Sequence, residues 1–148
     1  MRSSVPLSSL RFRAATTPAD LPGNCVPNLL TIDGRPIAVF NINGEMFALL
    51  NRCPHQGGSL VDGRLIGLVE APVPGDYRYS RQGEILRCPW HGWEFDVRTG
   101  QSWFDPDKTR VRRYPVTVEP ASAVLARGPY TAETYPVTVE EQVLVVEI

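Results

Sequence analysis

Two short segments of this chain concentrate its metal-binding side chains. Cys53-Pro54-His55 and Cys88-Pro89-Trp90-His91 contain both histidines of the 148-residue sequence and two of its three cysteines. Each segment therefore offers one thiolate and one imidazole. Two thiolates and two imidazoles suit either a tetrahedral zinc ion or a [2Fe-2S] cluster whose thiolates bind one iron and whose imidazoles bind the other. The fold must bring the two segments together around such a centre.

The residues that follow each histidine favour the iron-sulfur cluster over zinc. The first segment continues Gln56-Gly57-Gly58, and the second continues Gly92-Trp93-Glu94-Phe95. In both, glycine frees the backbone to bend around a bulky inorganic core and to point amides at it. Zinc fingers usually take two cysteines from one turn and two histidines from another, whereas each segment here carries one of each.

This pattern closely resembles the motif of the Rieske family, which is C-x-H, a variable spacer, and then C-x-x-H-G. The resemblance extends from about Phe12 to the C-terminus. It implies an all-β Rieske iron-sulfur fold, with stacked antiparallel sheets and a cluster-binding subdomain of two loops. It also implies a [2Fe-2S] cluster in which Cys53 and Cys88 hold the buried iron, while His55 and His91 hold the outer iron at the tip of the protein.

Four neighbouring positions indicate a branch of that family. By the same resemblance, the high-potential respiratory members carry a disulfide at the positions of Gly58 and Trp90, and hydroxyl groups at the positions of Trp93 and Phe95. A neutral hydrogen bond contributes about 0.5–1.5 kcal/mol, so losing two should lower the reduction potential by on the order of 100 mV. The sequence is therefore similar to the soluble, low-potential ferredoxins that serve ring-hydroxylating dioxygenases.

Length and charge narrow the remaining possibilities. We expect one domain over residues 1–148, with a flexible tail at 1–8 and the cluster-binding part at about 52–106. A net charge of −1 provides no basic field for nucleic acid or for an anionic membrane.

The longest apolar runs, such as residues 46–50, are too short to span a bilayer. Residues 1–17 resemble a transit peptide in their arginines and serines, but alternation over residues 10–14 favours a tail before a first strand, and we expect a cytoplasmic protein.

The third cysteine, Cys25, lies far upstream of both segments. We expect it to be a small apolar residue rather than a reactive thiol. If Cys53 and Cys88 bind metal, Cys25 has no partner for a disulfide, which agrees with a reducing compartment.

Strands dominate the predicted secondary structure. Asp33-Gly34 and Asn43-Gly44 are strong two-residue turn signals and predict strands at residues 28–32, 36–42 and 45–51. A hairpin-like unit follows at 85–97 around Cys88 and turns into 101–103, and later strands are expected at 110–119, 134–140 and 143–148. The hexapeptide Tyr-Pro-Val-Thr-Val-Glu occurs at 114–119 and again at 135–140, and predicts two strands of one sheet.

The spacer between the two segments is longer than the compact spacer of simple Rieske ferredoxins. Its excess lies near residues 65–83, which are rich in proline and glycine. We expect a surface insertion there, with a partner-recognition loop as the alternative.

Three residues or segments beside the motif have two interpretations each. Arg52 and Arg87 precede the two cysteines, and we expect them to be solvent-facing neighbours rather than groups that steer an acidic partner. Residues 103–106 fall where the resemblance places a third loop over the cluster, although an ordinary packing role fits them as well.

The favoured function is a soluble electron carrier whose redox partners, a reductase and an oxygenase, dock at the His55/His91 tip near Gln56, Pro89 and Trp90. An oxygenase is excluded, because its mononuclear iron needs two further histidines with a carboxylate and no histidine remains. A non-redox regulatory or assembly subunit, resembling the small nitrite reductase subunits that often lack cluster ligands, is disfavoured because all four ligands are present. A zinc-binding interaction module is the other alternative.

Overall fold

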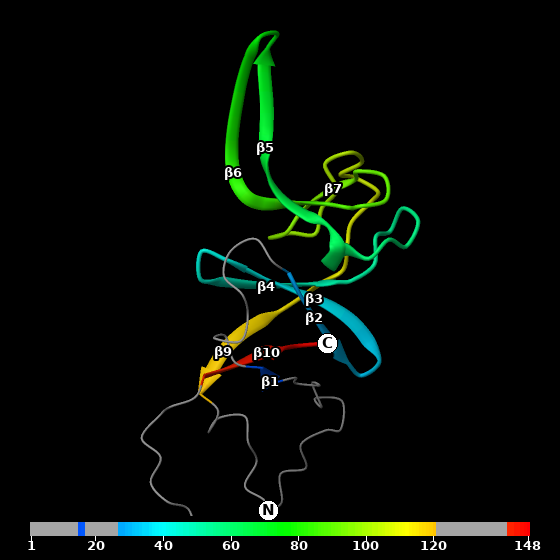
Figure 1. The fold of residues 1–148 in the computed structure, drawn as a ribbon, viewed down its shortest axis with the longest axis vertical. Coiled ribbons are helices and arrows are strands. Elements are labelled where there is room, and N and C mark those ends of the chain that lie inside the picture. The colour runs from blue at the N-terminus through cyan, green and yellow to red at the C-terminus, as the bar shows by residue number, and fades with distance from the viewer. Residues whose placement is uncertain (1–14, 17–26, 121–141) are drawn as a thin grey trace, which may run out of the picture.

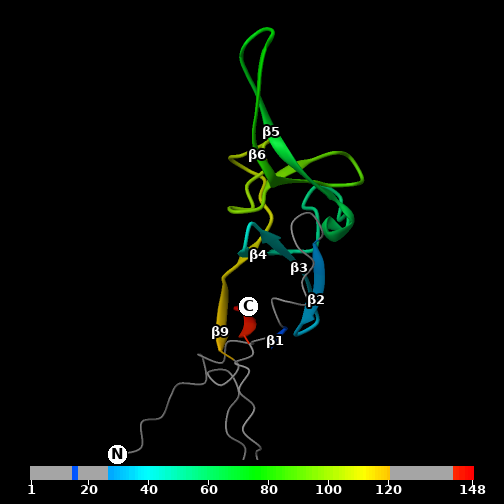
Figure 2. The same ribbon diagram turned by 60° about the vertical axis from the view of Figure 1, so that its left-hand side comes forward.

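The computed structural model describes residues 15–16, 27–120 and 142–148. Its strands form three antiparallel sheets arranged along the long axis of the molecule (Figures 1 and 2). The basal sheet contains β1 (Ala15–Thr16), β10 (Gln142–Val146) and β9 (Val116–Pro120) in that order. The central sheet contains β2 (Asn28–Ile32), β3 (Arg35–Ile42), β4 (Glu45–Leu50) and β8 (Arg113–Tyr114). The third sheet contains β5 (Arg64–Val73), β6 (Asp76–Arg87) and β7 (Glu94–Asp96), and the short 3-10 helix η3 (Leu60–Asp62) precedes it. The predicted all-β class is confirmed, and none of the described helical segments has the length and apolar character to cross a membrane.

The central sheet is buried on both faces, which explains the unbroken apolar run of β3. Successive side chains of a strand point to opposite faces. Ile37 and Val39 pack toward the basal sheet in a core that includes Leu144 and Val146. Ala38, Phe40 and Ile42 pack on the other side in a core that includes both Cys53 and Cys88. The cysteine-bearing loops therefore rest directly on the central sheet.

The two predicted hairpin turns are confirmed. Asp33 and Gly34 have φ values of 50° and 72°, and Asn43 and Gly44 have φ values of 52° and 88°. Positive φ at both central residues is the type I′ geometry that matches the twist of antiparallel strands. Strand β2 has the predicted bounds, and β3 and β4 differ from their predicted bounds by one residue.

The prediction of one continuous strand at 110–119 is wrong. Residues 113–114 form β8 of the central sheet, and residues 116–120 form β9 of the basal sheet. Pro115 lies between them and has no N–H to continue a ladder, so the chain changes sheets there. The first hexapeptide copy thus spans two sheets. The second copy, the predicted strand at 134–140, residues 1–14 and Cys25 lie outside the described residues.

The long spacer is a β-ribbon, which was not predicted as such. β5 and β6 pair antiparallel from Arg64↔Arg87 to Val73↔Asp76 and extend away from the other sheets (Figures 1 and 2). The surface location is confirmed, since most side chains of its outer part are exposed. Pro72 lies near the end of the ribbon, where an edge strand tolerates proline.

Candidate metal centre

The two cysteine-histidine segments form loops with the same backbone hydrogen bonds. In each loop the cysteine N–H donates to the carbonyl five residues further on, and the cysteine carbonyl accepts from the glycine N–H four residues further on. The bonds are Cys53 N to Gly58 O at 2.8 Å, Gly57 N to Cys53 O at 2.8 Å, Cys88 N to Trp93 O at 2.8 Å and Gly92 N to Cys88 O at 3.1 Å. One backbone frame is therefore built twice, from residues far apart in the sequence.

A glycine in the left-handed region closes each frame. Gly57 has φ +86° and Gly92 has φ +74°. Residues with a Cβ rarely adopt this conformation, which explains the C-P-x-x-G pattern that both segments share. The histidine occupies the third position of the first loop and the fourth position of the second.

The loops bring the two predicted cysteines together below the surface. Cys53 and Cys88 are free thiols, and each is 2% exposed. Burial raises the pKa of the Cys53 thiol, the backbone N–H groups of His55 and Gln56 act against this, and the adjacent Cys88 raises the pKa further. Two buried thiols side by side, with amides directed at one sulfur, suit a cationic metal centre that favours the thiolate form.

The two histidines lie outside the thiol pair. His55 and His91 are both exposed, and their ring centroids are 4.9 Å apart with the planes at 87°. The four predicted donors therefore lie in two pairs, a buried pair of thiols and an exposed pair of imidazoles. Within the described residues, no group of three or more His, Cys, Asp or Glu side chains is placed to hold a single metal ion. A thiol pair below an imidazole pair is the donor order that a two-iron cluster requires.

Aromatic side chains cover one of the imidazoles. Trp93 stacks on His55 with ring centroids 4.5 Å apart and planes at 19°. Phe104 packs on Trp93 with centroids 4.8 Å apart and is itself 77% exposed. An open recess beside His91 is bounded by Trp93, Trp103 and Phe104. The segment 103–106 therefore lies next to the loops, as its resemblance to a third loop implied, but nothing in the sequence indicated that Trp93 would stack on His55.

The two positions that match the respiratory disulfide are in contact. A Cβ placed on Gly58 would lie 3.0 Å from Cγ of Trp90 and 3.0 Å from Sγ of Cys88. Gly58 is buried, so the absence of a side chain there lets the two loops approach each other.

The arginines before the two cysteines face solvent, as predicted. Arg52 is exposed, and the Arg87 side chain is 52% exposed. Arg87 binds Glu94 across the β6–β7 pair at 2.6 Å, so its charge is paired within the chain.

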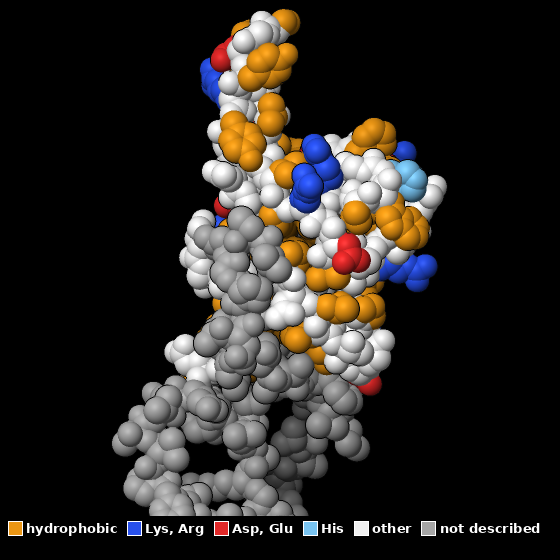
Figure 3. All heavy atoms as spheres, in the orientation of Figure 1, with side chains coloured by type: hydrophobic (Ala, Val, Ile, Leu, Met, Phe, Trp, Pro, Cys, Tyr) orange, Lys and Arg blue, Asp and Glu red, His pale blue; other side chains and the backbone are white. Residues whose placement is uncertain are grey.

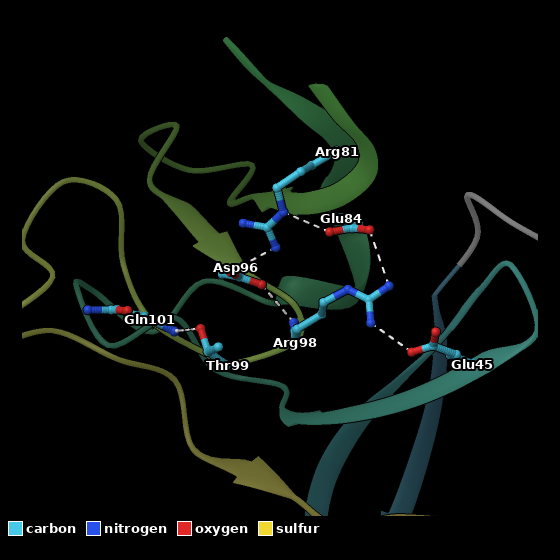
Figure 4. Close-up of polar contacts among 7 residues, drawn as sticks. All are labelled: Glu45, Arg81, Glu84, Asp96, Arg98, Thr99 and Gln101. Carbon is cyan, nitrogen blue, oxygen red and sulfur yellow. Dashed lines mark hydrogen bonds and ion pairs between the residues drawn. The ribbon is translucent and has the colours of Figure 1, made fainter. Parts of the chain in front are cut away.

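Different polar groups support the two loops. Beside the first loop, the neutral Asn51 side chain donates to Ser59 Oγ at 3.1 Å and accepts from Val61 N–H at 2.7 Å. On the strands that carry the second loop, ion pairs join β6, β7 and the start of β4 (Figure 4). These pairs are Arg81–Glu84 at 2.8 Å, Arg81–Asp96 at 2.8 Å, Arg98–Glu84 at 3.2 Å and Arg98–Glu45 at 2.7 Å. Hydrogen bonds from Arg98 and Arg81 lower the pKa of Glu84. Neither set of contacts was predicted from the sequence.

Comparisons with known proteins identify the family of this domain. The Rieske [2Fe-2S] domain matches residues 13–115. The ferredoxin component of the naphthalene 1,2-dioxygenase system of Pseudomonas putida is 29% identical over 90 residues, which cover 61% of this chain and 71% of the relative. The 3-phenylpropionate/cinnamic acid dioxygenase ferredoxin subunit of Escherichia coli K12 is 32% identical over 91 residues, which cover 61% and 72%.

A solved structure extends the likeness over most of the fold. The ferredoxin of carbazole 1,9a-dioxygenase from Nocardioides aromaticivorans IC177 superimposes with a TM-score of 0.58 over 90% of this chain and 96% of that one. Its sequence is 22% identical, so this likeness concerns the fold alone. The matched domain covers both donor segments and more than half of the chain, and the cofactor of that domain is a [2Fe-2S] cluster. The chain therefore belongs to the Rieske [2Fe-2S] domain family, and the two relatives named above are ferredoxin components of dioxygenase systems.

Proposed function

We propose that this protein is an electron carrier that accepts one electron from a reductase and delivers it to an oxygenase. The observation that carries the proposal is the layered donor set, with a buried pair of thiols beneath an exposed pair of imidazoles, in a Rieske [2Fe-2S] domain. The relatives named as ferredoxin components of dioxygenase systems support the same direction of electron flow.

The proposed ligands are Cys53 and Cys88 for the inner iron and His55 and His91 for the outer iron. When bound, the cluster stores and releases one electron, and neutral imidazoles place its potential above that of all-cysteine clusters. The chain's own contribution is to keep water from the sulfurs and to hold the imidazole edges at the surface. The burial of Cys53 and Cys88 and the exposure of His55 and His91 support this division.

Partner docking is proposed at the tip formed by the two histidines. Gln56, Pro89 and Trp90 surround the tip and are exposed, and Trp90 is 59% exposed. An exposed aromatic residue beside a polar rim is a common anchor in protein interfaces. Weak electron-transfer complexes need only a small interface, which fits a tip of this size.

The proposal also includes one domain over residues 1–148, a cluster-binding part at about 52–106, and a cytoplasmic location. One continuous core joins the central sheet to both loops, which supports a single domain. The two unpaired buried thiols agree with a reducing compartment.

Visible absorption, acid-labile sulfide and the electron paramagnetic resonance of the dithionite-reduced protein test the proposal together. We expect a coloured protein with two irons and two sulfides that is reduced reversibly by one electron. A colourless protein with bound zinc would favour the zinc-binding module instead. A coloured protein that cannot be cycled between redox states would favour the non-redox subunit. Reoxidation of the reduced protein by an oxygenase encoded beside its gene then tests the partner class.

A further inference from the structure

Strand β5 has an open edge. β5 (Arg64–Val73) pairs only with β6, and within the described part of the chain no strand lies on its other side. An open edge presents unpaired backbone donors and acceptors, and natural proteins usually protect such an edge. The centre of β5, Leu65-Ile66-Gly67-Leu68-Val69, is apolar and carries no charge that would protect it.

The sequence of this edge is complementary to itself. Residues 64–70 read Arg-Leu-Ile-Gly-Leu-Val-Glu. If two copies run antiparallel with Gly67 opposite Gly67, Arg64 faces Glu70, Leu65 faces Val69 and Ile66 faces Leu68 of the second copy. Directly opposite residues of antiparallel strands share a face and contact each other. Every charge then meets its opposite, and every apolar side chain meets another.

The charges of the ribbon distinguish its two strands. On β6, every charged side chain has a partner within the chain: Asp76 with Arg78, Arg81 with Glu84 and Asp96, and Arg87 with Glu94. On β5, Arg64 and Glu70 are exposed, and neither forms an ion pair with another described residue. The strand with the open edge is therefore also the strand whose charges are left for another molecule.

The centre of β5 is held in place before any association. The Gly67 N–H donates to Tyr79 Oη at 2.9 Å, and a Cβ on Gly67 would lie 2.4 Å from Cζ of Tyr79. The base of the ribbon is tied by Arg81 to Asp96 at 2.8 Å. An ordered strand loses little conformational entropy when a second strand pairs with it.

Apolar side chains also line one face of the ribbon. Val69 lies opposite Tyr79. Tyr77 is two residues before Tyr79 in β6, so its side chain points to the same face. Val69 is 61%, Tyr77 75% and Tyr79 59% exposed. Figure 3 shows hydrophobic side chains along the projecting ribbon. Pairing at β5 would place the second ribbon beside this face.

We propose that two copies of this protein associate through β5, antiparallel about a two-fold axis at Gly67, so that two ribbons form one four-stranded sheet. The same patch is used by both copies, as a closed two-fold dimer requires. An edge of about seven residues buries less surface than a standard stable interface, so the dimer is weak and depends on concentration. The proposal does not depend on the cluster or on the electron-transfer function.

Sedimentation equilibrium of the purified protein over a range of concentrations tests the association. We expect the wild type to follow a monomer–dimer equilibrium. Glu70→Arg or Arg64→Glu should weaken dimerisation at least about tenfold, because like charges then face each other twice per dimer. The double variant Arg64→Glu/Glu70→Arg should recover the wild-type association. Asp107→Arg, a charge reversal at an exposed position outside the ribbon, should leave it unchanged.

Two results would overturn the proposal. One is a wild-type protein that sediments as a monomer at every concentration up to its solubility limit. The other is a double variant that fails to recover association while its cluster spectrum shows that it is folded. In a mixed isotope-labelled sample, nuclear Overhauser contacts between Leu65 of one copy and Val69 of the other should appear. A dimer without those contacts uses another surface and also contradicts the proposal.

Discussion

The two cluster loops have one backbone frame and different surroundings. In both, the cysteine N–H and carbonyl form the same pair of hydrogen bonds, and a glycine with positive φ closes the turn. His55 in the first loop is stacked on Trp93, whereas His91 in the second borders an open recess. The frame is thus a local property of each segment, and the environment of each imidazole depends on what the rest of the fold brings to it.

The supports beneath the loops differ in the same way. Neutral hydrogen bonds of Asn51 brace the first loop, and ion pairs centred on Glu84 and Arg98 join the strands that carry the second loop. The first support is insensitive to pH, while the second requires a charged carboxylate. Matched substitutions in both loops therefore test the shared backbone frame. Substitutions of residues that contact only one loop test the surroundings supplied by the rest of the fold.

The largest effect should be the same in both loops. We expect Cys53→Ser and Cys88→Ser each to abolish the visible absorption of the cluster, because each would remove one of the two proposed thiolate ligands of the inner iron. Cys25→Ser is the control and should keep the full spectrum and iron content. The apo forms should unfold at lower denaturant concentration than the holoprotein. A cluster that survives the loss of Cys53 or Cys88, or is lost with Cys25, would contradict the ligand assignment.

Matched glycine variants test the shared frame. Gly57→Ala and Gly92→Ala should each lower the free energy of unfolding by about 1–2 kcal/mol, because alanine is strained at positive φ. The nearest atom to a new Cβ at Gly57 is Arg52 Nε at 3.5 Å, and nothing lies within 4 Å at Gly92, so neither change adds a clash. Denaturant titration measures the effect, with Gln56→Ala as a control at an exposed position without positive φ. Clearly unequal losses would show that the two frames are not equivalent.

Acid should weaken the second loop before the first. Ion pairing lowers the folded-state pKa of Glu84 below its unfolded value, so its contribution to stability is complete above the unfolded pKa of about 4.3. The contribution is lost as the pH falls through the folded-state pKa. Glu84→Gln should lower stability at neutral pH and flatten the acid limb of the stability profile. Hydrogen exchange of the wild type at acid pH should increase near Val97 and Arg98 before it increases near Val61, and the reverse order would contradict the difference between the supports.

The stacked indole distinguishes the two histidines. Trp93→Leu removes an aromatic contact of about 0.5–1.5 kcal/mol from His55 and none from the ring of His91. In pulsed electron paramagnetic resonance of the reduced cluster, we expect the coupling of one histidine nitrogen to change and that of the other to stay. Trp90→Leu is the control, since Trp90 stacks on neither imidazole in the described structure. Equal changes at both nitrogens would show that Trp93 acts on the whole cluster.

The smallest effect concerns the reduction potential. Because Trp93 and Phe95 carry no hydroxyl, the midpoint potential near neutral pH should lie in the lower part of the Rieske range of about −150 to +300 mV. Phe95 is fully buried in the core that holds both cysteines, and Phe95→Tyr should raise the potential by tens of millivolts if its hydroxyl donates to sulfur. Protein-film voltammetry measures both values. A wild-type potential near the upper end of the range would contradict the interpretation of these two positions.

Features that depend on a few adjacent residues could be predicted before the structure was known. The Asp33-Gly34 and Asn43-Gly44 turns and the strands beside them follow from short-range geometry, and residue chemistry proposes the four candidate ligands. The positions of the glycines that close the two loops are also visible in the sequence, since C-P-x-x-G occurs in both segments. The prediction of one long strand at 110–119 was wrong because of a single residue. Pro115 divides this segment between two sheets.

The sequence by itself determined which residues are the candidates to hold the cluster and where the chain turns, because thiolate, imidazole and left-handed glycine are properties of single positions. Only the tertiary structure decided what surrounds them. Arg98 binds Glu45, which is 53 positions earlier, and Trp93 covers His55 from the opposite loop. The pairing of β5 with β6 likewise joins Arg64 to Arg87 across the whole spacer. Such contacts depend on how separate segments pack on the central sheet, and no local pattern encodes the distance between two segments that are far apart in the chain.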